Sequence, residues 1–298
     1  MSGLKPYAGI SRGPFLLLPI TLVASGAAAA AYAGQFSWLH TTVGLFGLVA
    51  LHIAANVFNE WSDMARTGID LHTQRTPFSG GTGTLPSGAI STRSALLYGI
   101  GWAIVGLAVG IWFITRIGWG LLPIMIVGAV TIVFYTDVLT KLGLGELAAG
   151  LGLGALPVIG IALVQTGSVP DPALAAAIPA FFMTFNLLLL NEFPDAEVDR
   201  QGGRRHLIIR FGRPAAARIY AVAAILTPVA IVVAVIMGYL PPLALTATLP
   251  SVVLLVKPLQ WAFGNPEQPV PLPAMGANVI WNLSTNTLLA IALIVHTL

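Results

Sequence analysis

The chain has 298 residues, of which 56% are hydrophobic and only 8% are charged, and its mean hydropathy is +0.87. Because a soluble domain carries about 25% charged residues, this composition excludes an ordinary soluble protein and predicts a polytopic protein embedded in a lipid bilayer. The formal net charge of +3 gives no support for a nucleic-acid partner. The chain has no cysteine, which excludes disulfides, thiolate metal sites and a cysteine nucleophile.

Nine apolar segments are long enough to cross a bilayer, which takes about 17 to 25 helical residues. The expected fold is therefore all-α, a single domain over residues 1–298 with about nine transmembrane helices around a central cavity. The first segment follows Lys5 and Arg12, and we interpret it as a retained helix because it is long and no polar stretch with a cleavage site follows it. The segments lie at 14–33, 41–58, 94–115, 118–136, 146–166, 172–190, 217–238, 241–262 and 277–297.

Basic residues indicate how these helices are oriented, because Lys and Arg accumulate in cytoplasmic loops. With nine helices, all 14 basic residues except Arg116 fall at the N-terminus or around the loops after the second, fourth, sixth and eighth helices. The acidic residues except Asp171 fall on the same side. We therefore expect the N-terminus and the acidic loops to face the cytoplasm, with Leu298 on the opposite face of the membrane.

A short motif occurs twice, each time where an apolar segment runs into a polar loop. Residues 59–63 read Asn-Glu-Trp-Ser-Asp, and residues 191–195 read Asn-Glu-Phe-Pro-Asp. Because four apolar segments separate the copies, both lie on one side of the membrane, which predicts two related halves, about 1–140 and 141–298, that meet at one cavity.

The spacing of the polar residues places them on common helix faces. Residues at intervals of three, four or seven share a face of a helix, although Gly68 interrupts the first series. Mg²⁺ prefers oxygen ligands and is commonly held by one or two carboxylates together with substrate phosphates. The pattern therefore predicts a metal-bound diphosphate; the alternative is a set of solvated acids that balance nearby arginines. The residues in phase are Asn56, Asn59 or Glu60, Asp63 and Asp70 in the first copy, and Asn191, Asp195 and Asp199 in the second.

The runs at residues 56–63, 75–81 and 191–204 together resemble the UbiA superfamily of intramembrane prenyltransferases, over nearly the whole chain. The resemblance implies a membrane enzyme that transfers a prenyl group from an isoprenyl diphosphate to an aromatic acceptor, with Mg²⁺, or Mn²⁺ in its place, as cofactor. It also implies a plasma membrane location in a prokaryote. The six residues between Asp63 and Asp70 make the chain more similar to the dihydroxynaphthoate, menaquinone-forming branch than to the 4-hydroxybenzoate branch.

The resemblance also assigns roles to individual residues. The implied metal ligands are Asn56, Asn59, Asp63, Asp70, Asp195 and Asp199. The implied diphosphate contacts are Arg12, Asn59, Arg75, Tyr135, Lys141, Asn191 and Arg204. The implied catalytic residues are Asp63, Asp70, Asp195, Asp199 and Lys141. Without the family, an interfacial aromatic anchor is the simpler interpretation of Tyr135, and a topology determinant that of Lys141. For Arg12 a topology determinant is the alternative to a diphosphate contact, and Asp137 has no role that the sequence explains.

Several other polar groups carry weaker expectations. For His52 we favour an interhelical hydrogen bond over a position that faces the cavity, and His72 and His206 lack the partners of a metal triad. The segment 80–88 would wrap phosphates with backbone amides or act as a mobile lid. Polar residues in a membrane helix usually face the bundle interior, so we expect helix packing from Asn278, Asn282 and Asn286, with binding of the acceptor as the alternative.

Three other functions fit part of the pattern. A secondary transporter would hold its binding groups near the bilayer midplane, whereas the acids here concentrate at one membrane face. A phosphatidyl-type alcohol transferase would need one dense acidic stretch, which the second copy of the motif argues against. A terpene cyclase, or a transferase with a non-quinone substrate, would use the same ionisation of an allylic diphosphate.

Overall fold

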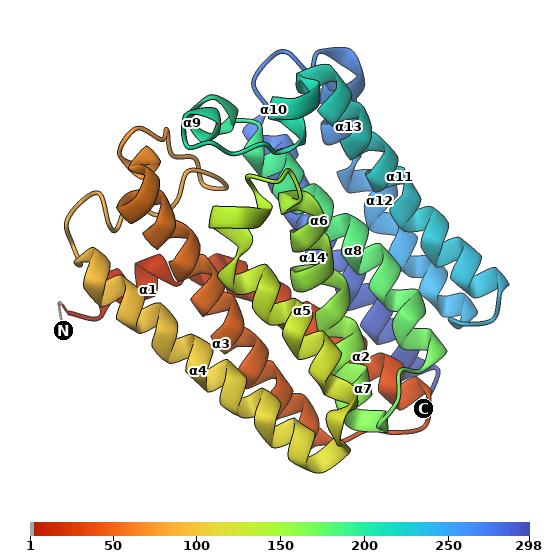
Figure 1. The fold of residues 1–298 in the computed structure, drawn as a ribbon. Coiled ribbons are helices and arrows are strands. Elements are labelled where there is room, and N and C mark those ends of the chain that lie inside the picture. Colours follow the sequence, from red (N-terminus) through yellow and green to blue (C-terminus); the bar gives the residue numbers. More distant parts are fainter. Residues whose placement is uncertain (1–2) are drawn as a thin grey trace.

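The computed structural model describes residues 3–298, and every regular element in that range is a helix (Figure 1). The long helices lie side by side, and short helices and loops gather at the end of the bundle that carries α9 and α10. The longer elements are α2 (Leu17–Tyr32), α3 (Trp38–Ser62), α4 (Thr92–Ile117), α5 (Leu122–Val133), α7 (Leu156–Thr166), α8 (Asp171–Glu192), α11 (Arg213–Ile236) and α14 (Leu272–Val295).

Shorter helices extend or connect these elements. The 3₁₀ and π turns are η1 (Gly13–Leu16), η2 (Asp63–Thr67), η3 (Ile69–Leu71), η4 (Trp119–Leu121), η5 (Tyr135–Leu139), η6 (Leu151–Ala155) and η7 (Pro242–Thr248). The short α-helices are α1 (Lys5–Ile10), α6 (Gly145–Gly150), α9 (Ala196–Gln201), α10 (Leu207–Phe211), α12 (Leu249–Leu254) and α13 (Val256–Gly264).

Seven of the described helices are long and apolar enough to cross a membrane, so the expected all-α membrane fold is confirmed. The expected count of nine is not. The eighth segment bends by 50° between α12 and α13, because Pro258 has no N–H to donate to the carbonyl of Leu254. The fourth segment, Trp119–Val133, is too short for the same criterion, because the regular helix ends at Phe134 and continues as the π turn η5.

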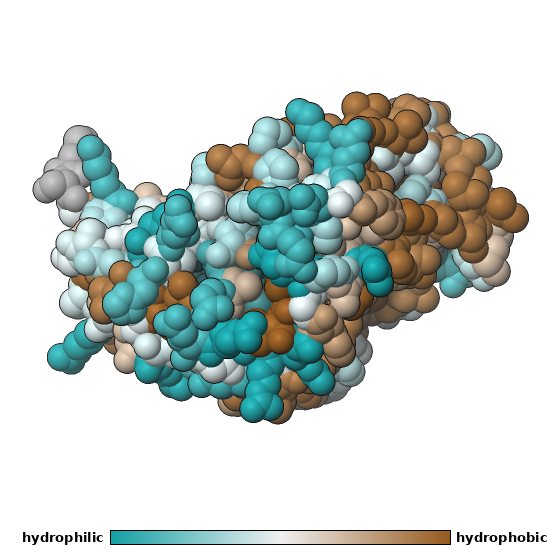
Figure 2. All heavy atoms as spheres, turned by 90° about the horizontal axis from the view of Figure 1, so that it is seen from above, coloured by the Kyte–Doolittle hydropathy of each residue, from teal (hydrophilic) through white to brown (hydrophobic). Residues whose placement is uncertain are grey.

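The surface divides into an apolar flank and a polar end. Ile104 on α4, Val222 on α11 and Val252 on α12 are among many exposed large hydrophobic residues. Soluble monomers rarely expose such contiguous apolar area, whereas lipid would cover it. Figure 2 views the molecule from the end with α9 and α10 and shows hydrophilic residues gathered there.

Small residues let the helices approach closely. A Cβ atom at Gly106 of α4 would lie 2.4 Å from the Leu51 side chain of α3, and one at Gly47 would lie 2.6 Å from Val109. Membrane helices commonly pack through such small residues. This contact fixes α3, which carries the first acidic motif, against α4.

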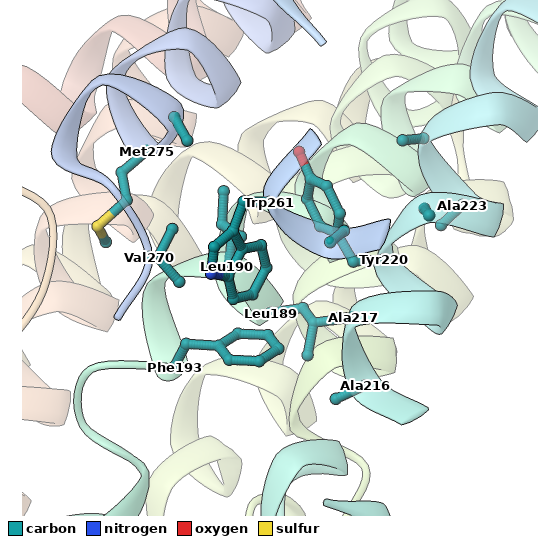
Figure 3. Close-up of a cluster of buried hydrophobic side chains, with 14 of the residues drawn as sticks. Leu189, Leu190, Phe193, Ala216, Ala217, Tyr220, Ala223, Trp261, Val270 and Met275 are labelled. Atoms are coloured by element: carbon teal, nitrogen blue, oxygen red, sulfur yellow. The ribbon is translucent and has the colours of Figure 1, made fainter. Parts of the chain in front are cut away.

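A second packing unit fixes the end of α8, which leads to the second motif. Phe193 and Trp261 meet edge to face with their ring centroids 4.8 Å apart (Figure 3). Next to them, Tyr220 donates a hydrogen bond to Asn278 Oδ1 at 2.9 Å, and Asn278 Nδ2 donates to the carbonyl oxygen of Asn186 at 3.2 Å. The expected packing role of the asparagines in α14 is therefore confirmed for Asn278, and Asn282 and Asn286 are likewise buried.

Candidate active site

One cavity at the polar end of the bundle receives side chains from both motifs. It lies between α3, η5, α6 and α8, and the loop at residues 73–81 covers part of it. Ten of the residues singled out from the sequence line it: Arg12, Asn56, Asn59, Asp63, Asp70, Tyr135, Asn191, Asp195, Asp199 and Arg204. The two motifs, far apart in the sequence, thus face a common space.

The end of α3 determines where the side chains of the first motif point. The helix stops at Ser62 and widens into the π turn η2, which begins with Asp63. Gly68, at φ 69°, ends this turn in the left-handed region that favours glycine. The chain then folds back, so that Asp70 on η3 points into the same cavity as Asp63 although no continuous helix joins them.

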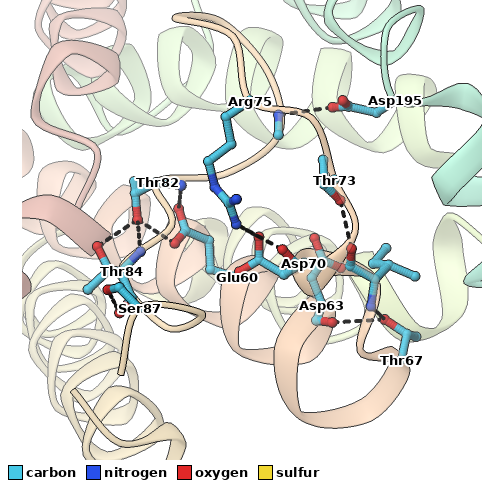
Figure 4. Close-up of polar contacts among 12 residues, drawn as sticks. Glu60, Asp63, Thr67, Asp70, Thr73, Arg75, Thr82, Thr84, Ser87 and Asp195 are labelled. Atoms are coloured by element: carbon cyan, nitrogen blue, oxygen red, sulfur yellow. Dashed lines mark hydrogen bonds and ion pairs between the residues drawn. The ribbon is translucent and has the colours of Figure 1, made fainter. Parts of the chain in front are cut away.

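The second motif sits on a break between two helices. α8 ends at Glu192, Pro194 lies in the following turn, and Asp195 occupies the position just before α9. The Gly80 N–H donates a hydrogen bond to Asp195 Oδ2 at 3.0 Å, and Figure 4 shows the loop after Arg75 reaching Asp195 in this way. The glycine-rich loop that follows the first motif is therefore attached to the second.

Arg204 joins the two motifs by ion pairs. Its guanidinium donates to Asp63 Oδ1 and, at 2.6 Å, to Asp199 Oδ1. Burial alone would lower the pKa of Arg204, but the carboxylates of Asp63 and Asp199 outweigh burial and raise that pKa above its ordinary value. Removing this arginine would leave two carboxylates facing each other in a largely buried place.

The cavity holds more negative charge than its arginines compensate. Burial raises the pKa of Asp70 to about 6, although Arg75 opposes the shift. Burial, and then repulsion from Asp199, raise the pKa of Asp195 to about 7, although the Gly80 N–H opposes the shift. A bound cation would lower both pKa values again, because an opposite charge nearby favours the ionised carboxylate.

Several oxygens in this cavity fit a divalent cation. Within residues 3–298, the buried atoms without a hydrogen-bond partner include Asp70 Oδ2, Asn191 Oδ1 and Asp195 Oδ1. Asn56 and Asn59 use their side-chain N–H groups, on the Ser11 carbonyl oxygen at 3.1 Å and Thr136 Oγ1 at 3.2 Å. Hard carboxylate and amide oxygens are the ligands that Mg²⁺ prefers, so the donor set fits this ion.

Two predicted diphosphate contacts do not line the cavity. Lys141 is exposed, because the chain turns outward after η5. Arg75 instead donates to Asp70 Oδ1 at 2.7 Å and to the Asp70 carbonyl oxygen at 2.8 Å. Asp137, unexplained from the sequence, accepts a hydrogen bond from Ser62 at 2.7 Å and lies 3.0 Å from Arg66. Its role in this structure is to fasten η5 to the end of α3.

The expectations for two histidines are wrong. His52 makes no interhelical hydrogen bond among the residues described; its Nδ1 lies 3.1 Å from the Leu48 carbonyl oxygen of the same helix, and the side chain lines the cavity. His206, expected to lack metal-site partners, lies beside Glu146 and Glu192. His72 is exposed.

The glutamates of the two motifs were not predicted as site residues. Glu60 is buried and accepts hydrogen bonds from Arg12 at 2.7 Å and from the Thr82 hydroxyl at 2.7 Å. Glu192 is buried at the wall of the cavity. The signals in the sequence were the Asn-Glu pair that begins both copies of the motif and the helical spacing that places Glu60 in phase with Asp63.

A second, apolar cavity adjoins the first. It lies between α3, α4, α5 and the pair η6 and α7, and its walls are mostly Gly, Leu, Ile and Val. His52, Ile132 and Leu153 line both cavities. A polar chamber with paired acidic motifs therefore adjoins an apolar chamber among the membrane helices, an arrangement suited to a substrate with a charged head and a long apolar tail.

Fold and site together define a polytopic membrane protein of the intramembrane transferase type. The model of the UbiA prenyltransferase family matches residues 17–293. The chain belongs to this family, and it is an integral membrane prenyltransferase.

Individual relatives agree with this assignment. The chain is 26% identical, over 257 residues, to the 1,4-dihydroxy-2-naphthoate octaprenyltransferase of Bacillus subtilis, a match that covers 84% of this chain and 80% of that protein. Its fold is similar to an apo UbiA homologue from Aeropyrum pernix, with a TM-score of 0.72, 18% identity, and coverage of 96% and 98% of the two chains. It is also similar to a UbiA homologue from Archaeoglobus fulgidus bound to DMAPP and Mg²⁺, with a TM-score of 0.68, 17% identity, and coverage of 98% and 99%.

Proposed function

We propose that this prenyltransferase moves a prenyl group from an isoprenyl diphosphate to a dihydroxynaphthoate or a related quinone precursor, and that it needs Mg²⁺, which Mn²⁺ can replace. The observation that carries the proposal is the meeting of both acidic motifs in one cavity, joined by Arg204. The naphthoate prenyltransferase relative supports the acceptor, and the neighbour bound to DMAPP and Mg²⁺ supports the donor and the ion.

The cation would be held by carboxylates from both motifs, chiefly Asp63 and Asp70 on one side and Asp195 and Asp199 on the other. Asn56 and Asn59 can add amide oxygens, because each donates its N–H elsewhere. When bound, the ion offsets the charge that develops on the departing diphosphate.

Arg12 and Arg204 supply permanent positive charge beside the carboxylates. Arg12 has φ 53° and is the one non-glycine residue with positive φ among residues 3–298. Such strained conformations cost about 1 to 3 kcal/mol and persist where the surrounding structure imposes them. Here the Arg12 guanidinium is held by Glu60 Oε1 at 2.7 Å at the wall of the cavity, where it can pair with a phosphate oxygen. The hydroxyl group of Tyr135, which also lines the cavity, can donate a hydrogen bond to a second phosphate oxygen.

The proposed reaction breaks the bond between the allylic carbon and the diphosphate oxygen, and both electrons leave with the diphosphate. The allylic cation is then attacked by a carbon of the electron-rich acceptor ring, a carbon–carbon bond forms, and the ring loses a proton. Asp70 or a neighbouring carboxylate of the cavity would accept this proton. The apolar chamber beyond Ile132 and Leu153 would hold the tail and exclude water from the cation.

The orientation of the site completes the proposal. The excess of basic residues around the motif-bearing loops favours a cytoplasmic active site in a prokaryotic plasma membrane. Lys141, on this account, contributes to that orientation, because it is exposed and lies outside the cavity.

The function is tested by product analysis. The purified protein in detergent is incubated with Mg²⁺, isoprenyl diphosphates of different lengths, and dihydroxynaphthoate, 4-hydroxybenzoate or no acceptor, and the products are identified by mass spectrometry. We expect a prenylated naphthoate product. Prenylation of 4-hydroxybenzoate alone would refute the acceptor, a cyclised hydrocarbon formed without acceptor would indicate a terpene cyclase, and an unchanged diphosphate would refute the transferase proposal.

A further inference from the structure

A buried cluster of three ionisable side chains adjoins the acidic motifs and includes Glu192, the glutamate of the second motif. Glu146 is near the start of α6, Glu192 is at the end of α8, and His206 precedes α10. Their exposed fractions are 1%, 8% and 1%. One ligand atom of each residue lies within 4.8 Å of those of the other two.

The cluster has unmet hydrogen-bonding capacity. Glu192 Oε2 and both ring nitrogens of His206 are buried without a hydrogen-bond partner among the described residues. His206 Nε2 lies 3.3 Å from Asp199 Oδ2, but without the alignment of a hydrogen bond. Glu146 Oε1 accepts the Leu207 N–H at 2.6 Å, which leaves its second oxygen available. Buried polar groups in native proteins nearly always have partners, so the cluster lacks one.

The missing partner is a cation or a proton shared between the two carboxyl groups. Two buried carboxylates face each other, and the nearby guanidinium of Arg204 is already paired with Asp63 and Asp199. Uncompensated buried charge is strongly destabilising. A cation between the three side chains would satisfy both carboxylates and the imidazole at once.

We propose that Glu146, Glu192 and His206 form a separate divalent-cation site of two carboxylates and one imidazole. This donor set differs from the oxygen-only set of the acidic motifs. Imidazole together with carboxylate suits first-row transition ions such as Mn²⁺ or Zn²⁺ better than Mg²⁺. Ligand atoms within 4.8 Å of one another need only a small contraction to surround one ion at metal–ligand distances of about 2.0 to 2.2 Å.

The position of the site indicates what it does. The three ligands come from α6, α8 and the segment before α10, so the ion would pin the connection between α8 and α10 against the membrane helices. That connection carries Asp199 and Arg204. His206 touches Asp199 directly, and the neighbouring Arg205 N–H donates to the Thr140 carbonyl oxygen at 2.9 Å. The site therefore positions Asp199 and Arg204; this role rests on the proposed function, whereas the existence of the site does not.

The test measures ligation rather than turnover. The full-length protein in detergent, with no diphosphate present, is loaded with Mn²⁺ and desalted; bound metal is counted by elemental analysis, and electron spin echo modulation from a coordinated ¹⁴N is recorded. We expect about one tightly held ion with a histidine nitrogen signal in the wild type. Asp63→Asn should keep both, even though it loses prenyl transfer.

Variants assign the signal. His206→Gln should abolish the nitrogen modulation, and Glu146→Gln should lower the affinity for Mn²⁺ at least tenfold, whereas Glu197→Gln, whose side chain is 76% exposed, should change neither. His52→Gln should keep the signal, and this result would exclude His52, the histidine at the cavity wall, as the source of the nitrogen modulation. If the His206 variant fails to fold, the wild-type nitrogen signal and the Mn²⁺ affinity of Glu146→Gln still show whether the site exists. Absence of nitrogen modulation in the wild type would overturn the site and indicate a proton shared between the two glutamates.

Discussion

The substitution Asp195→Asn separates the chemical role of the second motif from its structural role. The amide oxygen of the introduced asparagine can still accept the Gly80 N–H, which lies 3.0 Å from Asp195 Oδ2, so the loop should stay attached. The charge, however, is gone, and an N–H₂ group can replace the carboxylate oxygen Oδ1 that has no hydrogen-bond partner among the described residues. The substitution should therefore raise the stability of the metal-free fold and weaken the binding of the metal ion.

The size of both effects follows from the environment of the carboxyl group. Removing one preorganised electrostatic contact from a transition state costs about 10² to 10³ in rate, or roughly 3 to 4 kcal/mol. For stability, burial and Asp199 raise the pKa of Asp195 from 3.8 to about 7. The folded metal-free protein thus holds this proton more tightly than the unfolded chain, so stability falls as the pH rises from about 4 to about 7, and the loss is complete at pH 8. For a fully buried carboxyl group, the loss in free energy of unfolding on ionisation would be about 4 kcal/mol. The side chain of Asp195 is only half-buried, and access of water reduces this loss to about 2 kcal/mol.

We therefore expect Asp195→Asn at pH 8, without metal, to melt a few degrees above the wild type, while its prenyl transfer rate with Mg²⁺ falls at least 100-fold. The assays are thermal unfolding in detergent and product formation by mass spectrometry. Glu197→Gln, an exposed acid two residues away, should match the wild type in both. A wild-type rate for Asp195→Asn would refute the assignment, and a lower melting temperature would refute the reasoning on charge.

Three further predictions concern other parts of the site. EDTA should abolish activity, and Mg²⁺ or Mn²⁺ should restore it; full turnover in chelator would contradict the metal role. As the pH falls from 8 through 7 and then 6, protons should displace the metal ion first from Asp195 and then from Asp70. Calorimetry in the presence of diphosphate should therefore show that Mg²⁺ binding weakens over this range. An affinity that does not change with pH would contradict the raised pKa values. Arg204→Gln should destabilise the metal-free protein by about 3 to 5 kcal/mol, because it leaves Asp63 and Asp199 unpaired; unchanged thermal unfolding would show that the ion pairs contribute little.

Topology is open to direct labelling, because the natural chain has no cysteine. Single cysteines at Ser79 and Gly203 should react only with a reagent that reaches the cytoplasmic side, and cysteines at Gln35 and Pro170 only from outside. The positive charge around the motifs predicts the cytoplasmic side, and their common cavity requires that positions 79 and 203 share one side. Labelling of positions 79 and 203 from opposite faces would contradict a shared site.

Hydropathy was enough to place the helices, because a bilayer demands long uninterrupted apolar segments. It could not foresee that Pro258 bends the eighth segment or that the fourth is short, since both depend on local backbone hydrogen bonds rather than on composition. The proposed division into two related halves stays a prediction.

The two acidic motifs were recognisable because their residues recur at helical spacing within short stretches. Arg204 stood in the same pattern, but its bridge between Asp63 and Asp199 depends on how α3 and the α9 region pack. Lys141 was assigned by resemblance, and the outward turn after η5 could not be seen in the sequence. Glu146, Glu192 and His206 come from three separate segments, so only the folded chain brings them together.

The most direct test of the central claim is the binding of an unreactive thiolodiphosphate analogue of the prenyl donor, followed by calorimetry. Both motifs hold the diphosphate through divalent ions in this account. Binding should therefore need Mg²⁺ and should weaken at least 100-fold in Asp63→Asn and in Asp195→Asn alike, with Glu197→Gln as the control. Equally tight binding without Mg²⁺, or in a variant of either motif, would contradict the shared metal-dependent site.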